Sequence, residues 1–263
     1  MRTSAEAVFS PWIAFATLFE REVRRYMKLA VQTIGAPFLS NVLFLAIFGE
    51  LLAARPSGVD GVPYLRFLVP GLVFMGAFLS AFQNPLFSLV AMKYQNTLQD
   101  LCQYPLSAMS RFAAFSLAGA QRGLLVGVMT YAAAGLFAGF SVARPVAFWA
   151  FLAAVAFVGA SAGIAVGLYL STFEQANLAV ALILTPALFL GGVFFNAAAA
   201  SSWLGVIAGH NPMTFLVGQA RRLYLGAGPV EAPATALLAI ALCIAALALA
   251  ANAVASRKGM RIE

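Results

Sequence analysis

The chain has 263 residues, of which 62% are hydrophobic and 10% are charged, and its formal net charge is +7 at pH 7. A soluble domain averages about 45–50% apolar and about 25% charged residues. This composition excludes a water-soluble enzyme or binding module and predicts a membrane protein. At about 20–25 residues per span, the length accommodates about six membrane-spanning helices and their connections.

The first expected element is an amphipathic helix within residues 1–28, lying along the cytoplasmic membrane surface. Ser10-Pro11 is typical of a helix start, a capping residue followed by proline. Apolar and aromatic residues then recur at helical spacing and share one face: Trp12, Phe15, Phe19, Val23 and Tyr26. Basic residues occupy the other faces, which is typical of an interfacial helix. A surface helix packed on protein is the alternative.

Hydrophobic stretches then form one transmembrane domain over residues 29–255. The expected spans are 29–52, 67–91, 112–140, 145–170, 176–195 and 234–255. Pro37, Pro85 and Pro186 interrupt three of them and are expected bending points. The cysteines, Cys102 and Cys243, have no metal-binding or disulfide spacing and are expected to be small apolar residues.

Two segments do not fit a span. Residues 93–107 are polar and contain Pro105 near their end, so we expect a short helix outside the bilayer. Residues 197–232 hold two moderately apolar pieces, the second capped by Asn211-Pro212. Re-entrant helices that enter the outer leaflet and return fit this pattern, and a plain amphipathic loop is the alternative.

The positions of lysine and arginine predict the orientation. Six spans put both termini on one side, and assigning that side to the cytoplasm places most basic residues in cytoplasmic segments. Such an excess is typical of the cytoplasmic side. We therefore expect both termini, the tail at 256–263 and the helix within 93–107 to be cytoplasmic.

No catalytic or metal-binding constellation is apparent. A phosphate-binding P-loop needs a lysine directly after a glycine, and none of the lysines follows one. The single histidine, His210, and the scattered carboxylates argue against a catalytic triad or a zinc site. We expect no catalytic residue, no metal and no bound cofactor on this chain. A membrane-embedded lipid or glycosyl transferase would need clustered acids, and an ion-coupled secondary transporter would show inverted repeats; both stay as alternatives.

Arg122 lies about ten residues into the third expected span, near the bilayer midplane at about 15 Å depth. A lone arginine there costs about 2.5–3.5 kcal/mol, so it requires a polar partner or a wet cavity. Glu50, Gln83 and Asn84 are the candidate partners on other spans. Two interpretations stay open: a buried pair that holds the bundle together, or contact with a negatively charged cargo.

Glycines recur every four residues on the third and fourth spans. They are Gly119, Gly123 and Gly127 on the third span, and Gly159, Gly163 and Gly167 on the fourth. Small residues at this spacing let helix backbones approach closely. We expect tight packing at these positions, within the chain or between two copies.

Short motifs follow in a distinctive order along the chain. They are FLVPGL from Phe67, YPL from Tyr104, LTP from Leu184, LGGVFF from Leu190 and NPMT from Asn211, followed by Arg221. With the basic amphipathic N-terminus, this order over about 15–255 resembles the ABC type 2 permease family, the membrane subunits of exporters of the daunorubicin-resistance and nodulation-factor kind.

The resemblance implies a fold, partners and a function. Members are all-α proteins that pair as dimers of six-span subunits, and each subunit binds a separate ATP-binding cassette subunit. We therefore expect two ATP-binding subunits carrying ATP and magnesium, a second copy of the chain, and lipids as partners, with no nucleic acid. Residues 93–107 correspond to the coupling helix of the family. The residues expected to couple to the ATPase are Leu98, Asp100, Leu101, Tyr104, Pro105 and Glu174.

The expected function is that of the permease subunit of an exporter in a bacterial inner membrane. Its expected substrate is amphipathic, lipid-linked or glycan-bearing.

Overall fold

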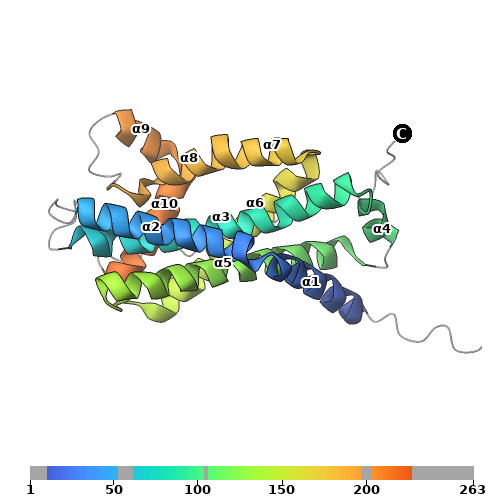
Figure 1. The fold of residues 1–263 in the computed structure, drawn as a ribbon, viewed down its shortest axis with the longest axis horizontal. Helices are drawn as coiled ribbons and strands as arrows, with labels where there is room; N and C mark the ends of the chain where they lie inside the picture. Colours follow the sequence, from blue (N-terminus) through green and yellow to red (C-terminus); the bar gives the residue numbers. More distant parts are fainter. Residues whose placement is uncertain (1–10, 53–61, 104–105, 197–202, 227–263) are drawn as a thin grey trace, which may run out of the picture.

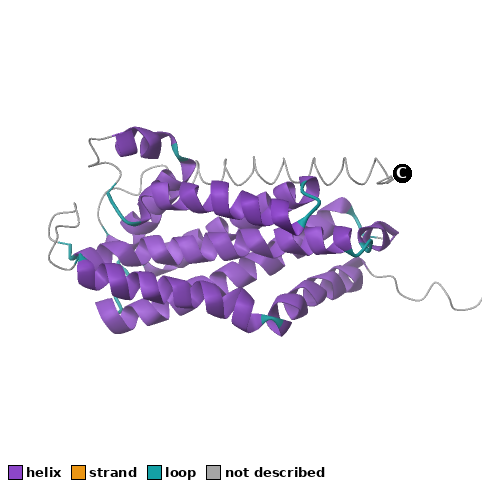
Figure 2. Ribbon diagram, turned by 45° about the horizontal axis from the view of Figure 1, so that its top comes forward, coloured by secondary structure: helices purple, strands orange, loops and turns teal. Residues whose placement is uncertain are grey.

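The computed structural model describes residues 11–52, 62–103, 106–196 and 203–226, which are helical apart from short loops and turns (Figure 2). No strand occurs within these ranges. The all-α class predicted from the sequence is confirmed for this part of the chain. Outside it lie the last expected span at 234–255, the tail at 256–263, Cys243, Tyr104 and Pro105.

The elements follow in chain order (Figure 1). The first are α1 (Pro11–Lys28), the π-helical turn η1 (Val31–Gly35), α2 (Ala36–Leu51), α3 (Tyr64–Tyr94) and α4 (Leu98–Gln103). Next come α5 (Ala108–Ala138), α6 (Pro145–Tyr169), α7 (Phe173–Leu178), η2 (Ala179–Leu184), α8 (Thr185–Leu188) and η3 (Phe189–Val193). The last described helices are α9 (Trp203–His210) and α10 (Pro212–Leu225).

Five described segments are long and apolar enough to cross a membrane. They are Val31–Leu51, Tyr64–Tyr94, Ala108–Ala138, Pro145–Tyr169 and Phe173–Val193. They agree with the first five expected spans to within a few residues at each end. The helices α3 and α5 have 31 residues each. At 1.5 Å per residue this is about 46 Å, more than the hydrocarbon core of about 30 Å, so both helices extend beyond it.

The bundle has two ends (Figure 1). At one end, here called the α4 end, α4 lies near α1 and near the turn that joins α6 to α7. The short helices α9 and α10 lie toward the opposite end, here called the α10 end. Two short helices thus occupy the segment where re-entrant helices were expected, and their depth in a bilayer stays a prediction.

The helix α3 is the centre of the bundle, and 83% of its most apolar window is buried. Both glycine ladders pack against it within the chain. A methyl group added at Gly159 would lie 2.9 Å from the carbonyl oxygen of Phe78, and one at Gly123 or Gly163 would meet an α3 carbonyl oxygen even more closely. Glycine therefore permits α5 and α6 to approach the backbone of α3.

The end of α3 differs from the sequence expectation. The helix continues through Lys93 to Tyr94, and the separate short helix begins at Leu98 instead of at Lys93 and is described as far as Gln103. Asn96 ends α3 with a left-handed backbone (φ 55°), which asparagine tolerates better than most residues. The Asn96 and Thr97 amides donate to the Lys93 and Met92 carbonyls, forming a Schellman cap that turns the chain into α4.

The fifth span is interrupted by π-helical turns on both sides of α8. The Thr185 hydroxyl donates to the Val180 carbonyl at 2.9 Å, just before Pro186. Gly192 then adopts a left-handed conformation (φ 80°) that ends the span. The predicted break at Thr185-Pro186 thus lies among irregular helical turns.

Candidate functional site

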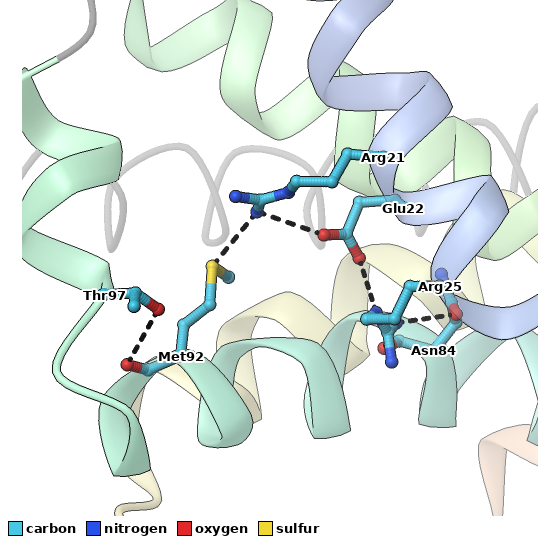
Figure 3. Close-up of polar contacts among 6 residues, drawn as sticks. All are labelled: Arg21, Glu22, Arg25, Asn84, Met92 and Thr97. Carbon is cyan, nitrogen blue, oxygen red and sulfur yellow. Dashed lines mark hydrogen bonds and ion pairs between the residues drawn. The ribbon is translucent and has the colours of Figure 1, made fainter. Parts of the chain in front are cut away.

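At the α4 end, charged residues of α1 contact α3 (Figure 3). The Glu22 carboxylate is only 1% exposed and pairs with Arg21 Nη2 and Arg25 Nε, each at 3.2 Å. Arg25 Nη2 also donates to the backbone oxygen and Oδ1 of Asn84, at 2.9 and 3.0 Å. A buried carboxylate persists in a protein only when it is paired in this way. This network fastens α1 to the middle of α3.

The two faces of α1 have different surroundings. Its Trp12 side chain is 71% exposed, as expected of a helix at a membrane surface. Leu18 and Tyr26, in contrast, are buried against the rest of the chain. The helix α1 therefore packs on protein along one face, and its exposed aromatic end is available to lipid.

A cleft of about 760 Å³ opens between α1, the end of α3 and α4. Its charged lining residues are Arg21, Glu22, Arg24, Arg25, Lys28 and Asp100. Arg24 is bound to Glu20 on its own helix at 2.5 Å, in an exposed pair. The cleft therefore carries an excess of positive charge on the α1 side and a single carboxylate on the α4 side.

The orientation of α4 determines which of the expected coupling residues are accessible. Leu98 and Leu101 were expected to face the ATPase, but each is only 5% exposed and packs in a cluster with Leu18, Leu89 and Met92. A short amphipathic helix buries its apolar face against its own domain because this removes apolar surface from water. Asp100 is exposed, so the polar side of α4 is its accessible surface.

Lys93 joins the end of α3 to the end of α6. Its ammonium donates to the carbonyl oxygens of Gly167, Leu168 and Leu170 at 2.9, 2.6 and 2.8 Å. The final carbonyls of a helix have no partner within the helix and favour a nearby cation. The Tyr94 ring also meets the Phe173 ring at 6.0 Å. Lys93 therefore attaches the end of α3, which leads into α4, to the end of α6, which leads into the α6–α7 turn.

The α6–α7 turn presents Glu174 in the exposed first turn of α7. Thr172 caps this helix by accepting from the Gln175 amide at 3.3 Å, and Gln175 Oε1 accepts from the Ser171 amide at 3.0 Å. Glu174 thus stands on a locally ordered turn beside the attachment point of Lys93.

The partner of Arg122 differs from the three candidates. Arg122 is 5% exposed, and its Nε and Nη2 donate to the backbone oxygen of Thr33 at 3.1 and 2.8 Å. Asn84 instead binds Arg25, and Glu50 lies exposed near the end of α2. Gln83 is half-buried on α3. The interpretation as a buried contact that holds helices together is the one this geometry favours.

The sequence motifs meet at the α10 end. Arg221 Nη2 donates to the Gly192 and Val193 carbonyls at 2.9 and 3.3 Å, and its guanidinium lies 3.6 Å from the centre of the Phe67 ring. Burial lowers the pKa of Arg221 to about 10, although the nearby Tyr64 opposes part of this shift. The side chain is therefore a cation at neutral pH.

Asn211 of the NPMT motif fastens the other end of α10. Its Oδ1 accepts from the Met213 amide at 3.0 Å, which caps the helix, and its Nδ2 donates to the Ala187 carbonyl at 2.6 Å. The helix α10 is therefore attached at both ends to the interrupted fifth span. Sequence reasoning identified these motifs but not their contact.

Among the described residues, no group of three or more histidine, cysteine or acidic side chains could hold a metal ion. The contacts described above are polar attachments between helices, and exposed Asp100 and Glu174 lie at the α4 end.

Comparison with known proteins supports this description. The model of the family described as "ABC-2 type transporter" matches residues 13–225. Proteins named "Inner membrane transport permease YadH" from Escherichia coli K12 and from Shigella flexneri are each 29% identical to the chain over 223 residues. The aligned region covers 83% of this chain and 86% of each relative. The chain therefore belongs to the ABC-2 type transporter family, as a membrane transport component.

Proposed function

We propose that this chain is the permease subunit of an exporter in a bacterial inner membrane, driven by a separate ATP-binding subunit. The relatives named as inner membrane transport permeases support the location and the class of protein. The excess of basic residues on α1, with Lys93 near α4, supports a cytoplasmic α4 end. We propose that both termini also lie on this side.

The observation that carries the proposal is the Lys93 attachment between the two surface segments of the α4 end. An ATP-binding subunit that moves α4 would move α3 and the α6–α7 turn with it, because Lys93 joins them. The accessible contacts in this proposal are Asp100 and Glu174, both exposed. Leu98 and Leu101 take part by anchoring α4 to α1 and α3, so a push on α4 reaches the bundle.

We further propose a second copy of the chain and a second ATP-binding subunit, each ATPase holding its own ATP and magnesium. Two spans are poorly covered by protein: 17% of the Val31–Leu51 window and 39% of the Phe173–Val193 window are buried. These spans adjoin through ring contacts of Phe44 with Phe189 and of Phe48 with Phe194. They form one continuous apolar side, where a second copy would meet the first.

The substrate class in this proposal is amphipathic, lipid-linked or glycan-bearing. It follows from the family resemblance, and an apolar seam between two copies would suit the lipid part of such a molecule. An ion-coupled transporter and a membrane transferase are the alternatives, and neither has a specific observation in its favour.

The test is recovery of the tagged chain from membranes of its native host, followed by measurement of ATP hydrolysis in the purified complex. We expect a nucleotide-hydrolysing subunit to co-purify and the chain alone to show no turnover. The double change Asp100→Lys and Glu174→Lys should reduce recovery of that subunit at least fivefold. Arg222→Glu, a charge reversal at the α10 end, is the control and should not. Absence of any ATPase from the wild-type complex would refute the proposal.

A further inference from the structure

The segment where α1 passes through η1 into α2, residues 26–37, is here called the elbow. We propose that Arg122 caps a backbone oxygen which Pro37 leaves without a donor, and that this contact fixes the angle between α1 and α2. Arg122 is then a positioning residue of the membrane domain and does not contact cargo.

Pro37 removes the usual donor of the Thr33 carbonyl. In an α-helix the carbonyl of one residue accepts from the amide four residues later. For Thr33 that residue is Pro37, which has no N–H. The preceding turn is already π-helical, with the Ala36 amide bonded to the Val31 carbonyl. The Thr33 carbonyl therefore lacks its α-helical donor in an apolar segment where lipid offers no replacement.

The helix α5 supplies a replacement donor. Arg122 places both Nε and Nη2 on the Thr33 oxygen, at 3.1 and 2.8 Å. A carbonyl oxygen has two lone pairs, so it can accept both hydrogens. Neighbouring helices commonly satisfy a carbonyl freed by proline in this way. The cost of burying Arg122 and the cost of the Pro37 break are thus offset by a single contact.

The helix α5 contacts both sides of the elbow. The residue before Arg122, Gln121, accepts from the Tyr26 hydroxyl at 3.2 Å, at the end of α1. The Thr33 hydroxyl donates back to the Tyr26 carbonyl at 2.8 Å. Arg25 also attaches α1 to α3, so the elbow joins a helix fixed to the core of the bundle to the more exposed helix α2.

A double-mutant cycle tests the inference directly. Pro37→Ala restores an amide for the Thr33 carbonyl, so it should make the donors of Arg122 redundant. Arg122→Met removes those donors and keeps an unbranched side chain. Both changes are made singly and together in a full-length background carrying Cys102→Ser and Cys243→Ser.

The readout is the distance between spin labels at Ile13 and Leu43, which are exposed on α1 and α2. Labelled protein is diluted with unlabelled protein so that only distances within one chain count. With Pro37 present, Arg122→Met should at least double the width of the distance distribution. In the Pro37→Ala background it should leave the width unchanged. Arg122→Met should also lower the thermal midpoint of unfolding, and this decrease should be about 5 °C larger with Pro37 than in the Pro37→Ala background.

Arg111→Met is the matched control, because Arg111 is also a buried arginine on α5. Its effect should be the same with proline or alanine at position 37. Equal effects of Arg122→Met in both backgrounds would overturn the inference. Neither measurement needs cargo or ATP, so this failure would leave the proposed export function untouched.

Discussion

Replacing Lys93 with methionine keeps the aliphatic stem and removes the ammonium that joins α3 to α6. Three carbonyl oxygens, those of Gly167, Leu168 and Leu170, then lose their donor. A buried acceptor left without a partner costs about 1–3 kcal/mol. Lys93 is only half-buried, so water can replace part of the interaction. We expect a net loss of about 2 kcal/mol at the end of α6.

At about 1.4 kcal/mol per factor of ten, this loss raises the local opening equilibrium about thirtyfold. Hydrogen–deuterium exchange followed by mass spectrometry measures it on peptides from residues 165–180. Peptides from the middle of α5 should be unaffected and serve as the internal control. In the complex with its ATPase, hydrolysis should continue while its coupling to transport falls.

Lys93→Arg separates charge from geometry. Arginine keeps the cation, but its planar group cannot direct donors to three carbonyls as an ammonium does. We expect exchange intermediate between the wild type and Lys93→Met. If hydrogen–deuterium exchange in Lys93→Met equals that of the wild type, the role of Lys93 in holding the α6–α7 turn is refuted. If exchange in Lys93→Arg equals that of the wild type, the geometry of the ammonium group contributes nothing beyond its charge.

Other changes test the packing and the attachments of α1 and α10. Gly163→Val should lower the stability of the fold by more than about 3 kcal/mol and reduce the yield of monodisperse protein, because the new side chain meets an α3 carbonyl. Gly218→Ala is the control and should leave the yield unchanged, because Gly218 faces open space. Asn211→Ala should lower stability by about 2 kcal/mol in thermal unfolding, since it removes a helix cap and the donor to α8. Glu22→Gln should cost about 1.5–3 kcal/mol and increase protease cleavage of α1, because two partly exposed arginines lose their charged acceptor.

Several features could be predicted from the sequence because they depend on local chemistry. The five described spans follow from runs of apolar residues, and the cap at Asn211-Pro212 follows from its residue types. The spacing of the glycines indicated close packing, and the structure places that packing against α3. Each of these depends on neighbours in sequence or on a helical repeat, which composition and spacing reveal.

Other features could not be predicted because they depend on which helices meet. The sequence does not show that Lys93 reaches α6, or that Leu98 and Leu101 turn toward α1. The partner of Arg122 was sought among side chains, whereas the structure supplies a backbone oxygen. One signal was present: Pro37 marks Thr33, four residues earlier, as a carbonyl in need of a donor.

The arrangement of contacts indicates which parts of the subunit can move relative to each other. α3 carries Lys93 near one end and Phe67, the ring beneath Arg221, near the other. The glycine contacts hold α5 and α6 against it along most of its length, so these three helices resist bending although Pro70 and Pro85 interrupt α3. The spans with least protein cover, Val31–Leu51 and Phe173–Val193, have polar attachments to other helices at the Thr33 and Ala187 carbonyls. Movement during transport is therefore expected between these two spans and a rigid core of α3, α5 and α6, with the elbow and α10 as the points where it is transmitted.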